Sequence, residues 1–395
     1  MRIRVGVFFG GQSVEHEVSI ISALQAIPMF DADKYEVVPV YMARDGGMYV
    51  GEADIEAYRD IPALVARSRR VAPVSEGGRF RLYLWPPGGL ARFFKGGRAL
   101  EIDVAFPIVH GTNVEDGALQ GWFKTMGVPF VGSGVVASAV GMDKYATKAM
   151  LKSAGIPALD CRLVLAKPFF ADADAEMEAL DSDFPVVVKP VNLGSSIGIS
   201  VAGSRAELRD ALSYAFRFTN SAIVERAVQP LREINCAVLG DRDGVEASEC
   251  EEPIGSGALL SYEDKYVVKG GGKGKGSAEL SAKGMGAAKR RLPADLSPDA
   301  RETVRDLACR AFRALGCSGV ARVDFLMDAD GTAWVNEVNT IPGSLAYYLW
   351  EAVGMPFPVL LDRLVDLALK REREEASLSY SFETSILRGA HLASQ

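Results

Sequence analysis

The chain lacks the sequence features of a disulfide-stapled, secreted or membrane-spanning protein. Its five cysteines are an odd number without a C-x-x-C spacing, which argues against a disulfide framework or a zinc site and favours a reducing compartment. No basic segment followed by an apolar one precedes the first strand, so we expect no signal peptide. No uninterrupted apolar run approaches the ~20 residues of a membrane span. We therefore expect a cytoplasmic protein without a membrane partner.

An excess of positive charge is also missing. Lysine and arginine together number 44 against 51 aspartates and glutamates, which gives a net charge of −7. No global basic field attracts nucleic acid, so we expect no nucleic-acid partner. The 395 residues exceed one typical core, and a hydrophobic content of 48% is ordinary for a globular chain. Two or three domains are therefore expected.

Two common phosphate-binding motifs are absent as well. The apolar strand 3–9 leads through a glycine pair into a helix for which Ser13 is the predicted N-cap, but G-x-G-x-x-G is missing. A later strand ends at Lys189, and the small-residue turn 192–198 follows it without the pattern G-x-x-x-x-G-K-[ST]. That turn offers backbone N–H groups and hydroxyls to phosphate oxygens, with Lys189 as the point charge. The alternative is a hairpin whose glycines serve only the turn geometry.

A polar hairpin is the most informative feature that the chain does contain. Two runs rich in β-branched and aromatic residues flank Asp328-Ala-Asp-Gly331, which predicts a hairpin turn. Side chains alternate between the two faces of a strand, so pairing brings Asp324, Glu337 and Asn339 together as oxygen ligands. Hard cations such as Mg²⁺ prefer these ligands. Arg322 shares the face of Asp324 and would meet a transferring phosphate or an oxyanion. A solvated polar face of the sheet is the alternative.

Capping patterns predict helices in the second half of the chain. Ser204 begins a capping box and opens a helix that runs to about residue 216. Ser297, followed by proline, opens a helix that stops at Gly316. An amphipathic helix is predicted over 357–373. Residues 66–100 show no periodicity and are expected to be irregular.

Three segments leave their roles open. His110 follows the apolar strand 103–109, where ligands gather in open α/β sheets, although a lone histidine there is more often structural. The long segment 255–291 has no periodicity and contains the glycine- and lysine-rich run 269–276. Loops of this length are usually lids or disordered segments. One interpretation is that its lysines close over polyphosphate, and the alternative is a solvated charge run. Residues 377–395 are expected to form a poorly structured tail.

Taken together, these segments resemble one family. Gly10-Gly-Gln-Ser-Val-Glu-His-Glu-Val-Ser19 and His110-Gly-x-x-x-Glu-Asp-Gly117 are similar to the amino-terminal signatures of D-alanine–D-alanine ligases. The resemblance continues in the family's order through Gln120-Gly121, Gly132-Ser-Gly134, Met142-Asp-Lys144, Lys189-Pro with Gly194-Ser-Ser-x-Gly198, Lys265-Tyr266, and Arg322-x-Asp324 with Glu337-Val-Asn-Thr-x-Pro-Gly343. As a set, these motifs run from residue 3 to about residue 370 and are highly specific for this branch of the ATP-grasp superfamily.

The resemblance implies a fold, a domain division and an activity. The fold is α/β and α+β, an ATP-grasp fold with an N-terminal Rossmann-like (pre-ATP-grasp) domain. Its implied domains are 1–141 (Rossmann-like substrate domain), 142–224 (central ATP-grasp lobe) and 225–376 (C-terminal ATP-grasp lobe), followed by the tail. The activity is ATP-dependent ligation of two D-alanines through an acylphosphate, giving D-alanyl-D-alanine for peptidoglycan synthesis. Small D-amino acids are the implied partners, and a homodimer is the implied assembly.

The resemblance also implies a role for each site residue. ATP, with two Mg²⁺ ions for which Mn²⁺ can substitute, would be held by Lys144, Lys189, Ser195, Ser196, Glu225, Val228, Glu233, Lys265 and Asn336. The metal ligands would be Asp324, Glu337 and Asn339. Glu15 would hold the first substrate's ammonium and would form a hydrogen-bonded trio with Ser195 and Tyr266. Arg322 and the Gly343 N–H would form the oxyanion hole. The implied substrate site also includes His110, Ser344 and Tyr348.

Two departures from the family pattern leave the second substrate open. Val114 stands where the family usually has glycine. After Pro342-Gly343 the family usually has Met/Phe-Thr-Ser-His-Ser-Leu, whose later serine helps to hold the second substrate's carboxylate. Here Tyr348 occupies that place, and either it or Ser344 would contact the carboxylate. One alternative is a ligase that joins D-alanine to another D-amino acid or a D-2-hydroxy acid, and the other is a nucleotide-binding regulator without turnover. Intact lysines and metal ligands count against the regulator.

Overall fold

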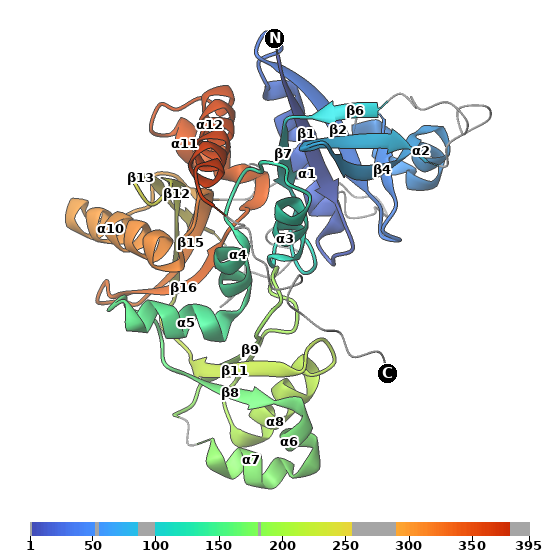
Figure 1. The fold of residues 1–395 in the computed structure, drawn as a ribbon. Helices are drawn as coiled ribbons and strands as arrows, with labels where there is room; N and C mark the ends of the chain where they lie inside the picture. The colour runs from blue at the N-terminus through green and yellow to red at the C-terminus, as the bar shows by residue number, and fades with distance from the viewer. Residues whose placement is uncertain (1, 52–54, 86–98, 181–182, 255–289, 380–395) are drawn as a thin grey trace, which may run out of the picture.

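Three sheets organise the part of the molecule that the structure describes (Figure 1). The computed structural model describes residues 2–51, 55–85, 99–180, 183–254 and 290–379. The predicted loop 269–276 and residues 380–395 of the predicted tail lie outside these ranges. No helix within them is both long and apolar enough to cross a membrane.

The N-terminal sheet has seven strands in the order β6-β5-β4-β3-β2-β1-β7. The strands are β1 (Ile3–Gly10), β2 (Tyr35–Met42), β3 (Met48–Val50), β4 (Arg69–Glu76), β5 (Arg79–Leu84), β6 (Ala99–Ile102) and β7 (Val104–Ile108). Strands β2, β1 and β7 are parallel, and helix α1 (His16–Ala26) connects β1 to β2. The helices α2 (Ile61–Arg67) and α3 (Ala118–Thr125) complete this domain. Its parallel part is the predicted Rossmann-like arrangement.

Most of the described residues between 66 and 100 form strands, so the prediction of irregular structure was wrong for this part of the segment. Strands β4 and β5 pair as a hairpin, and the two turn residues, Gly77 and Gly78, have positive φ angles of 59° and 72°. Positive φ at both central residues is what a tight hairpin turn requires. Val71 is the only fully buried side chain of β4, so this strand has no apolar alternation for a sequence pattern to detect.

The start of α1 also differs from its prediction. The helix begins at His16, with Glu15 as the N-cap and without a side-chain cap. Ser13 Oγ instead accepts the N–H of Glu15, at 3.1 Å. The Ser13 hydroxyl therefore orders the loop before the helix, and Glu15 occupies the N-cap position.

The central lobe is a four-stranded antiparallel sheet in the order β10-β9-β11-β8. Its elements are β8 (Cys161–Leu165), α6 (Ala166–Ala171), α7 (Ala173–Ala179), β9 (Val186–Pro190), β10 (Ser200–Ala202), α8 (Arg205–Ala215) and β11 (Ser221–Arg226). The three helices cover one face of the sheet (Figure 1). The predicted N-cap is confirmed, because Ser204 Oγ accepts the N–H of Glu207 at 3.3 Å.

The C-terminal lobe is a five-stranded antiparallel sheet in the order β14-β13-β12-β15-β16. Its elements are β12 (Arg232–Gly240), β13 (Val245–Pro253), β14 (Arg290–Arg291), α10 (Pro298–Leu315), β15 (Gly319–Met327) and β16 (Ala333–Asn339). Helix α10 has the predicted ends, since Ser297 caps its start and Gly316 ends it with a φ of 68°. The predicted hairpin between β15 and β16 is confirmed.

The remaining helices tie these units together. Helices α4 (Val135–Met142) and α5 (Lys144–Ser153) pack against β16 and α10 of the C-terminal lobe. The predicted domain boundary 141/142 therefore lies inside α4, and the boundary 224/225 lies inside β11. Beyond β16 come η5 (Gly343–Ala346), α11 (Tyr347–Glu351) and α12 (Phe357–Ala376).

One hydrophobic core joins the two ends of the chain. Buried side chains of α12, among them Leu360 and Leu364, share a cluster with Val5 and Phe106 of the N-terminal sheet. The central lobe has a separate cluster around Val188 and Leu208. The N-terminal domain and the C-terminal lobe are thus packed together through one core, and the central lobe has its own.

Candidate active site

The β15–β16 hairpin carries the predicted row of polar side chains. Asp324 lies opposite Glu337, and Arg322 lies opposite Asn339, so all four belong to one face of the sheet. A β-bulge between Asp324 and Phe325 shifts the register beyond this point. Bulges are common next to active sites because they re-aim side chains. Across the next strand, β12, the row continues with Asn235, which lies opposite Asp324.

Arg322 is fixed by its neighbour on the same strand. Its Nε donates to Asp324 Oδ1 at 2.6 Å, and its Nη2 donates to Oδ2 at 2.7 Å. Asn339 Nδ2 also donates to Oδ2, at 3.0 Å. Burial alone would lower the pKa of Arg322, but the Asp324 carboxylate raises it well above its usual range. The guanidinium is therefore a fixed positive charge in a buried site.

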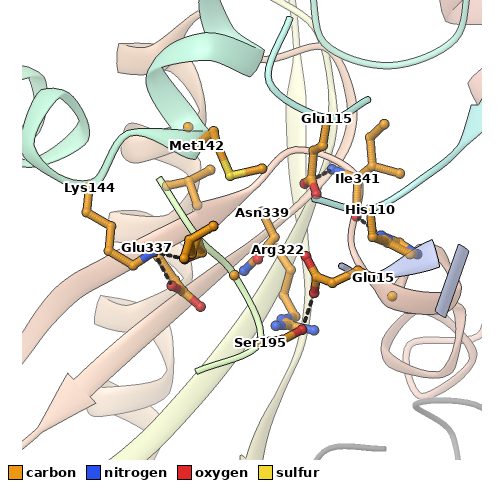
Figure 2. Close-up of a pocket in the computed structure, with 15 residues that line it drawn as sticks. Glu15, His110, Glu115, Met142, Lys144, Ser195, Arg322, Glu337, Asn339 and Ile341 are labelled. Atoms are coloured by element: carbon orange, nitrogen blue, oxygen red, sulfur yellow. Dashed lines mark hydrogen bonds and ion pairs between the residues drawn. The ribbon is translucent and has the colours of Figure 1, made fainter. Parts of the chain in front are cut away.

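The turn after β9 reaches the N-terminal helix. Ser195 and Ser196 have left-handed φ angles of 53° and 59°, which non-glycine residues adopt only when their surroundings hold them. Ser195 Oγ donates to the Glu15 carboxylate, which links the central lobe to the start of α1 (Figure 2). Glu15 and Ser195, two members of the trio that the family resemblance implies, are therefore in contact. Its third member, Tyr266, lies outside the described residues, as does Lys265.

Two buried lysines face this turn from different elements. Lys144 Nζ donates to the carbonyl of Leu193 at 2.5 Å and lies 3.8 Å from Glu337 Oε2. Lys189 Nζ donates to Asn336 Oδ1 at 2.7 Å. Both lysines are less than one-tenth exposed, so water would screen their attraction for an anion only weakly.

Glu225 pairs with two lysines in a fully buried cluster. Its carboxylate lies 2.8 Å from Lys148 Nζ and also contacts Lys189 Nζ. Burial alone would raise the pKa of Glu225, but the charges of Lys189 and Lys148 outweigh it and lower that pKa. Lys148 was not identified from the sequence as a site residue. It stands four residues after Lys144 on α5, so the same helix supplies both.

A small polar cavity brings the three lobes together. It measures about 60 Å³, and its lining includes Glu15 and His110 from the N-terminal domain, Ser195 from the central lobe, and Arg322 and Gly343 from the C-terminal lobe. Figure 2 shows these groups, except Gly343, converging around the cavity with Lys144, Glu337 and Asn339. Both basic and acidic side chains line it. We call it the substrate cavity.

Two further cavities lie next to the substrate cavity, and neighbouring cavities share lining residues. A cavity of about 40 Å³ shares Lys144 and Glu337 with the substrate cavity, and Ser196, Glu233 and Asn336 also line it. A cavity of about 300 Å³ shares Lys189 with that second one and is mostly apolar. Its lining includes Glu225, Val187, Val201, Val228, Leu231 and Leu326. The three cavities are therefore neighbours with shared walls, in a series that runs from an apolar end to a polar end.

Glu115 lines the substrate cavity, although sequence analysis assigned it no role. Its carboxyl oxygens accept the N–H of Gly111 at 3.1 Å and the N–H of Ile341 at 3.0 Å. Burial, with the nearby charge of Glu15, raises the pKa of Glu115 to about 8. The only signal for it was its place in the His110 motif. Burial likewise lowers the pKa of His110 to about 4, so its imidazole is neutral at pH 7.

Neither candidate for the second substrate's carboxylate is among the described residues that line the substrate cavity. Ser344 Oγ donates to Gln25 Oε1 of α1 at 2.7 Å. Tyr348 Oη donates to Glu251 Oε1 of β13 at 2.8 Å, and the Arg290 guanidinium lies 4.0 Å from the centre of the Tyr348 ring. Both hydroxyls are thus engaged with protein groups.

Comparisons with known proteins agree with this geometry. A family model described as "D-ala D-ala ligase N-terminus" matches residues 4–133, and one described as "D-ala D-ala ligase C-terminus" matches residues 150–366. A D-alanine–D-alanine ligase of Acetivibrio thermocellus is 38% identical over 93% of this chain and 96% of its own length.

Solved structures give the same result. The D-alanine–D-alanine ligase of Coxiella burnetii has a TM-score of 0.76 and 31% identity over 95% of this chain and 96% of that one. A D-Ala:D-Ser ligase of Enterococcus faecalis has a TM-score of 0.75 and 29% identity over 93% of this chain and 100% of that one. The predicted ATP-grasp fold is confirmed, and the chain belongs to the D-alanine–D-alanine ligase family.

Proposed function

We propose that this protein is an ATP-dependent ligase that joins two D-alanines to give D-alanyl-D-alanine, ADP and phosphate for peptidoglycan synthesis. The observation that carries the proposal is the series of three adjacent cavities, because it suits an extended nucleotide that meets a small charged substrate. Its apolar end suits adenine, and its middle, between Lys144 and Lys189, suits phosphates. Its polar end, with Glu15 and Arg322, suits an amino acid's ammonium and carboxylate.

The metal ligands are the residues of the β15–β16 face. Asp324, Glu337 and Asn339 carry oxygen donors on adjacent strands, which is the ligand set that Mg²⁺ prefers, so these residues fit the ion. We propose that they hold two Mg²⁺ ions and that Mn²⁺ substitutes for them. When bound, the ions neutralise charge on the transferring phosphoryl group.

In the first step, a carboxylate oxygen of one D-alanine attacks the γ-phosphorus of ATP, and the bond to ADP breaks. Lys144 and Lys189 hold the phosphate charge in place. Glu15 binds the ammonium group of this D-alanine and, through Ser195, keeps the turn 192–198 closed on the substrate. The product is D-alanyl phosphate, whose acyl carbon is open to attack.

In the second step, the amine of the other D-alanine attacks that acyl carbon. The carbonyl oxygen gains negative charge, which Arg322 and the N–H of Gly343 stabilise at the floor of the cavity. The tetrahedral intermediate collapses, phosphate leaves, and the nitrogen loses a proton. Arg322 is the main anion contact for the second carboxylate, because the hydroxyls of Ser344 and Tyr348 are engaged elsewhere.

A second candidate function is ligation of D-alanine to D-serine or to a D-2-hydroxy acid. The relative from Enterococcus faecalis is a D-Ala:D-Ser ligase, and the turn beyond Gly343 departs from the family pattern. We propose D-alanine as the preferred acceptor with relaxed selectivity, since neither hydroxyl lines the substrate cavity. We also propose that the protein works as a homodimer in the cytoplasm, and sedimentation velocity checks the dimer.

The test is to incubate the protein with ATP and Mg²⁺ and with D-alanine, D-serine, D-lactate or L-alanine. We expect phosphate release with D-alanine and the mass of D-alanyl-D-alanine, with a smaller mixed product when D-serine is added. Chelation of the metal should stop both signals, and Mn²⁺ should restore them. Phosphate release without any D-alanyl product would contradict the proposal.

A further inference from the structure

The turn that carries Gly343 is strained and depends on contacts from outside. Three successive residues after it, Ser344, Leu345 and Ala346, have left-handed φ angles of 52°, 54° and 51°. This conformation is unfavourable for L-residues, because Cβ then lies too close to the following carbonyl oxygen. None of the three is glycine, so the turn persists only where its surroundings hold it.

Helix α1 and the loop after β7 supply those contacts on both sides of Gly343. On one side, His110 Nδ1 lies 2.9 Å from the carbonyl oxygen of Ile341. On the other side, Ser22 Oγ accepts the N–H of Ser344 at 3.0 Å. The two anchors are themselves joined, because Ser22 Oγ lies 3.0 Å from His110 Nε2. Ser22 and His110 are buried, with exposed fractions of 1% and 4%.

We call the hydrogen bonds that lead from Ile341 through His110 and Ser22 to Ser344 the relay. The donor and acceptor atoms of these groups set the direction of each bond. The carbonyl of Ile341 can only accept, so His110 carries its proton on Nδ1. Its Nε2 is then an acceptor, and the Ser22 hydroxyl donates to it. The lone pairs of the same hydroxyl accept the N–H of Ser344. Burial lowers the pKa of His110 to about 4, so at pH 7 the imidazole is neutral and its Nε2 carries no proton.

Helix geometry places Ser22 on the same face of α1 as Glu15, which we propose binds the substrate's ammonium. Glu15, Ser19 and Ser22 are spaced by four and three residues, which places them in line along a helix. Ser19 Oγ accepts the backbone N–H of His110 at 2.9 Å. The helix end that presents Glu15 to the substrate therefore also holds His110.

We propose that Ser22 is a positioning residue that acts through His110 and Ser344 to hold the turn 341–344, so that the N–H of Gly343 points at the reacting carbonyl oxygen. His110 then lines the cavity without binding substrate through its nitrogens. This inference rests on the proposed ligase reaction, in which Gly343 is an oxyanion donor.

The kinetic test compares Ser22→Ala with a matched control, Ser248→Ala. Ser248 is equally buried, and its hydroxyl also accepts a backbone N–H, that of Ala237 at 2.9 Å, away from the turn. Loss of a complete oxyanion donor costs roughly 10²–10³ in kcat, so a misaligned donor in Ser22→Ala should lower kcat about tenfold or more. KM for ATP should stay within about twofold, and thermal unfolding should shift similarly in both variants.

A second measurement reads the relay in the wild-type protein directly. Long-range ¹H–¹⁵N correlation spectra of the imidazole rings should show the Nδ1–H tautomer for His110, assigned by the loss of its signals in a His110→Gln variant. An Nε2–H tautomer would overturn the relay. So would a Ser22→Ala variant that keeps wild-type kcat, or a Ser248→Ala variant that loses as much. If the wild-type protein forms no D-alanyl-D-alanine, the proposed reaction fails, and the catalytic role of Ser22 fails with it.

Discussion

Two buried groups, Glu115 and His110, hold opposite sides of the same residue in the substrate cavity. Glu115 accepts the N–H of Ile341, and His110 donates to its carbonyl oxygen. Burial favours the neutral form of each, so it raises the pKa of Glu115 to about 8 and lowers the pKa of His110 to about 4. The cavity thus keeps two ionisable groups uncharged beside the charged Glu15 and Arg322.

The raised pKa of Glu115 makes the stability of the fold depend on pH. A carboxyl whose pKa is raised by folding contributes stability that is complete below its unfolded pKa of about 4.3 and is lost as the pH rises through about 8. Between pH 5 and pH 8, the free energy of unfolding of the wild type should fall relative to that of Glu115→Gln. Urea unfolding of the metal-free proteins at both pH values measures this difference, and parallel behaviour of the two would contradict it.

Glu337 should matter for turnover more than for folding. Its side chain is 22% exposed on a polar face, so Glu337→Gln should change the melting temperature little. Loss of a metal ligand removes several kcal/mol of transition-state stabilisation, so turnover should fall by roughly 10²-fold or more. Glu36→Gln, the same change at an exposed position of β2, is the control. Phosphate release near the wild-type rate in Glu337→Gln would show that this face is not the metal site.

At the scale of elements, the turn between β9 and β10 packs directly on the start of α1. A Cβ atom added at Gly194 would lie 2.8 Å from Glu15 Oε2, which is too close for that carboxylate to stay in place. The backbone of Gly194 has an ordinary φ, so an alanine there meets only this obstacle. The glycine therefore leaves room for Glu15, which we propose binds the first substrate's ammonium.

Gly194→Ala should weaken binding of the first D-alanine and spare the nucleotide. We expect its KM for the first D-alanine to rise about tenfold or more, because a displaced Glu15 leaves a buried ammonium without its partner. Gly203→Ala is the control, since its added Cβ would lie 3.6 Å from the nearest atom. Initial rates over a range of D-alanine concentrations, and titration with a nucleotide analogue, separate the two effects. An equal loss of nucleotide affinity would point to a general distortion of the turn.

Tyr348 of helix α11 donates its hydroxyl to Glu251 of strand β13. Tyr348→Phe would leave the buried Glu251 without one of its donors, at a cost of about 1–3 kcal/mol in folding free energy. We expect a lower melting temperature with KM for the acceptor amino acid within about threefold of wild type. Tyr347→Phe, on the same helix, controls for loss of a hydroxyl. A large rise in the acceptor KM would instead place the Tyr348 hydroxyl on the substrate's carboxylate.

At the scale of the whole molecule, nucleotide binding should join two lobes that have separate cores. The apolar cavity takes Val187 and Val201 from the central lobe and Leu326 from the C-terminal lobe. A ligand that fills it contacts both lobes in the folded state only. At one hundred times its Kd, such a ligand adds about 2.7 kcal/mol to the free energy of unfolding.

A bulky residue at the mouth of this cavity should abolish that stabilisation. Val201 is 43% exposed, so Val201→Trp can be accommodated by the fold while its ring occupies the cavity. A non-hydrolysable ATP analogue should raise the melting temperature of the wild type but not that of Val201→Trp. Val74→Trp, a similarly exposed position on β4, should respond like the wild type. If both variants respond equally, the adenine lies elsewhere.

The sequence by itself determined the local features of this molecule. The strand alternation in 320–339 predicted that Asp324 and Glu337 meet on adjacent strands, and the serine caps at Ser204 and Ser297 predicted two helix starts. These features depend on backbone geometry and on contacts within a few residues, so a short pattern is enough to predict them. The family motifs extended this to the fold and the ligase activity.

Only the tertiary structure decided which distant residues meet. Ser22 reaches Ser344 across 322 residues of chain, and Tyr348 reaches Glu251 across 97. No local periodicity encodes such pairs, because they arise when separately folded elements pack into one core. Packing also overrode local patterns. Ser13 accepts a hydrogen bond within the loop before α1 instead of capping the helix, and Tyr348 donates to Glu251. A hydroxyl bonds to whichever partner burial leaves within reach, and only the assembled fold sets that partner.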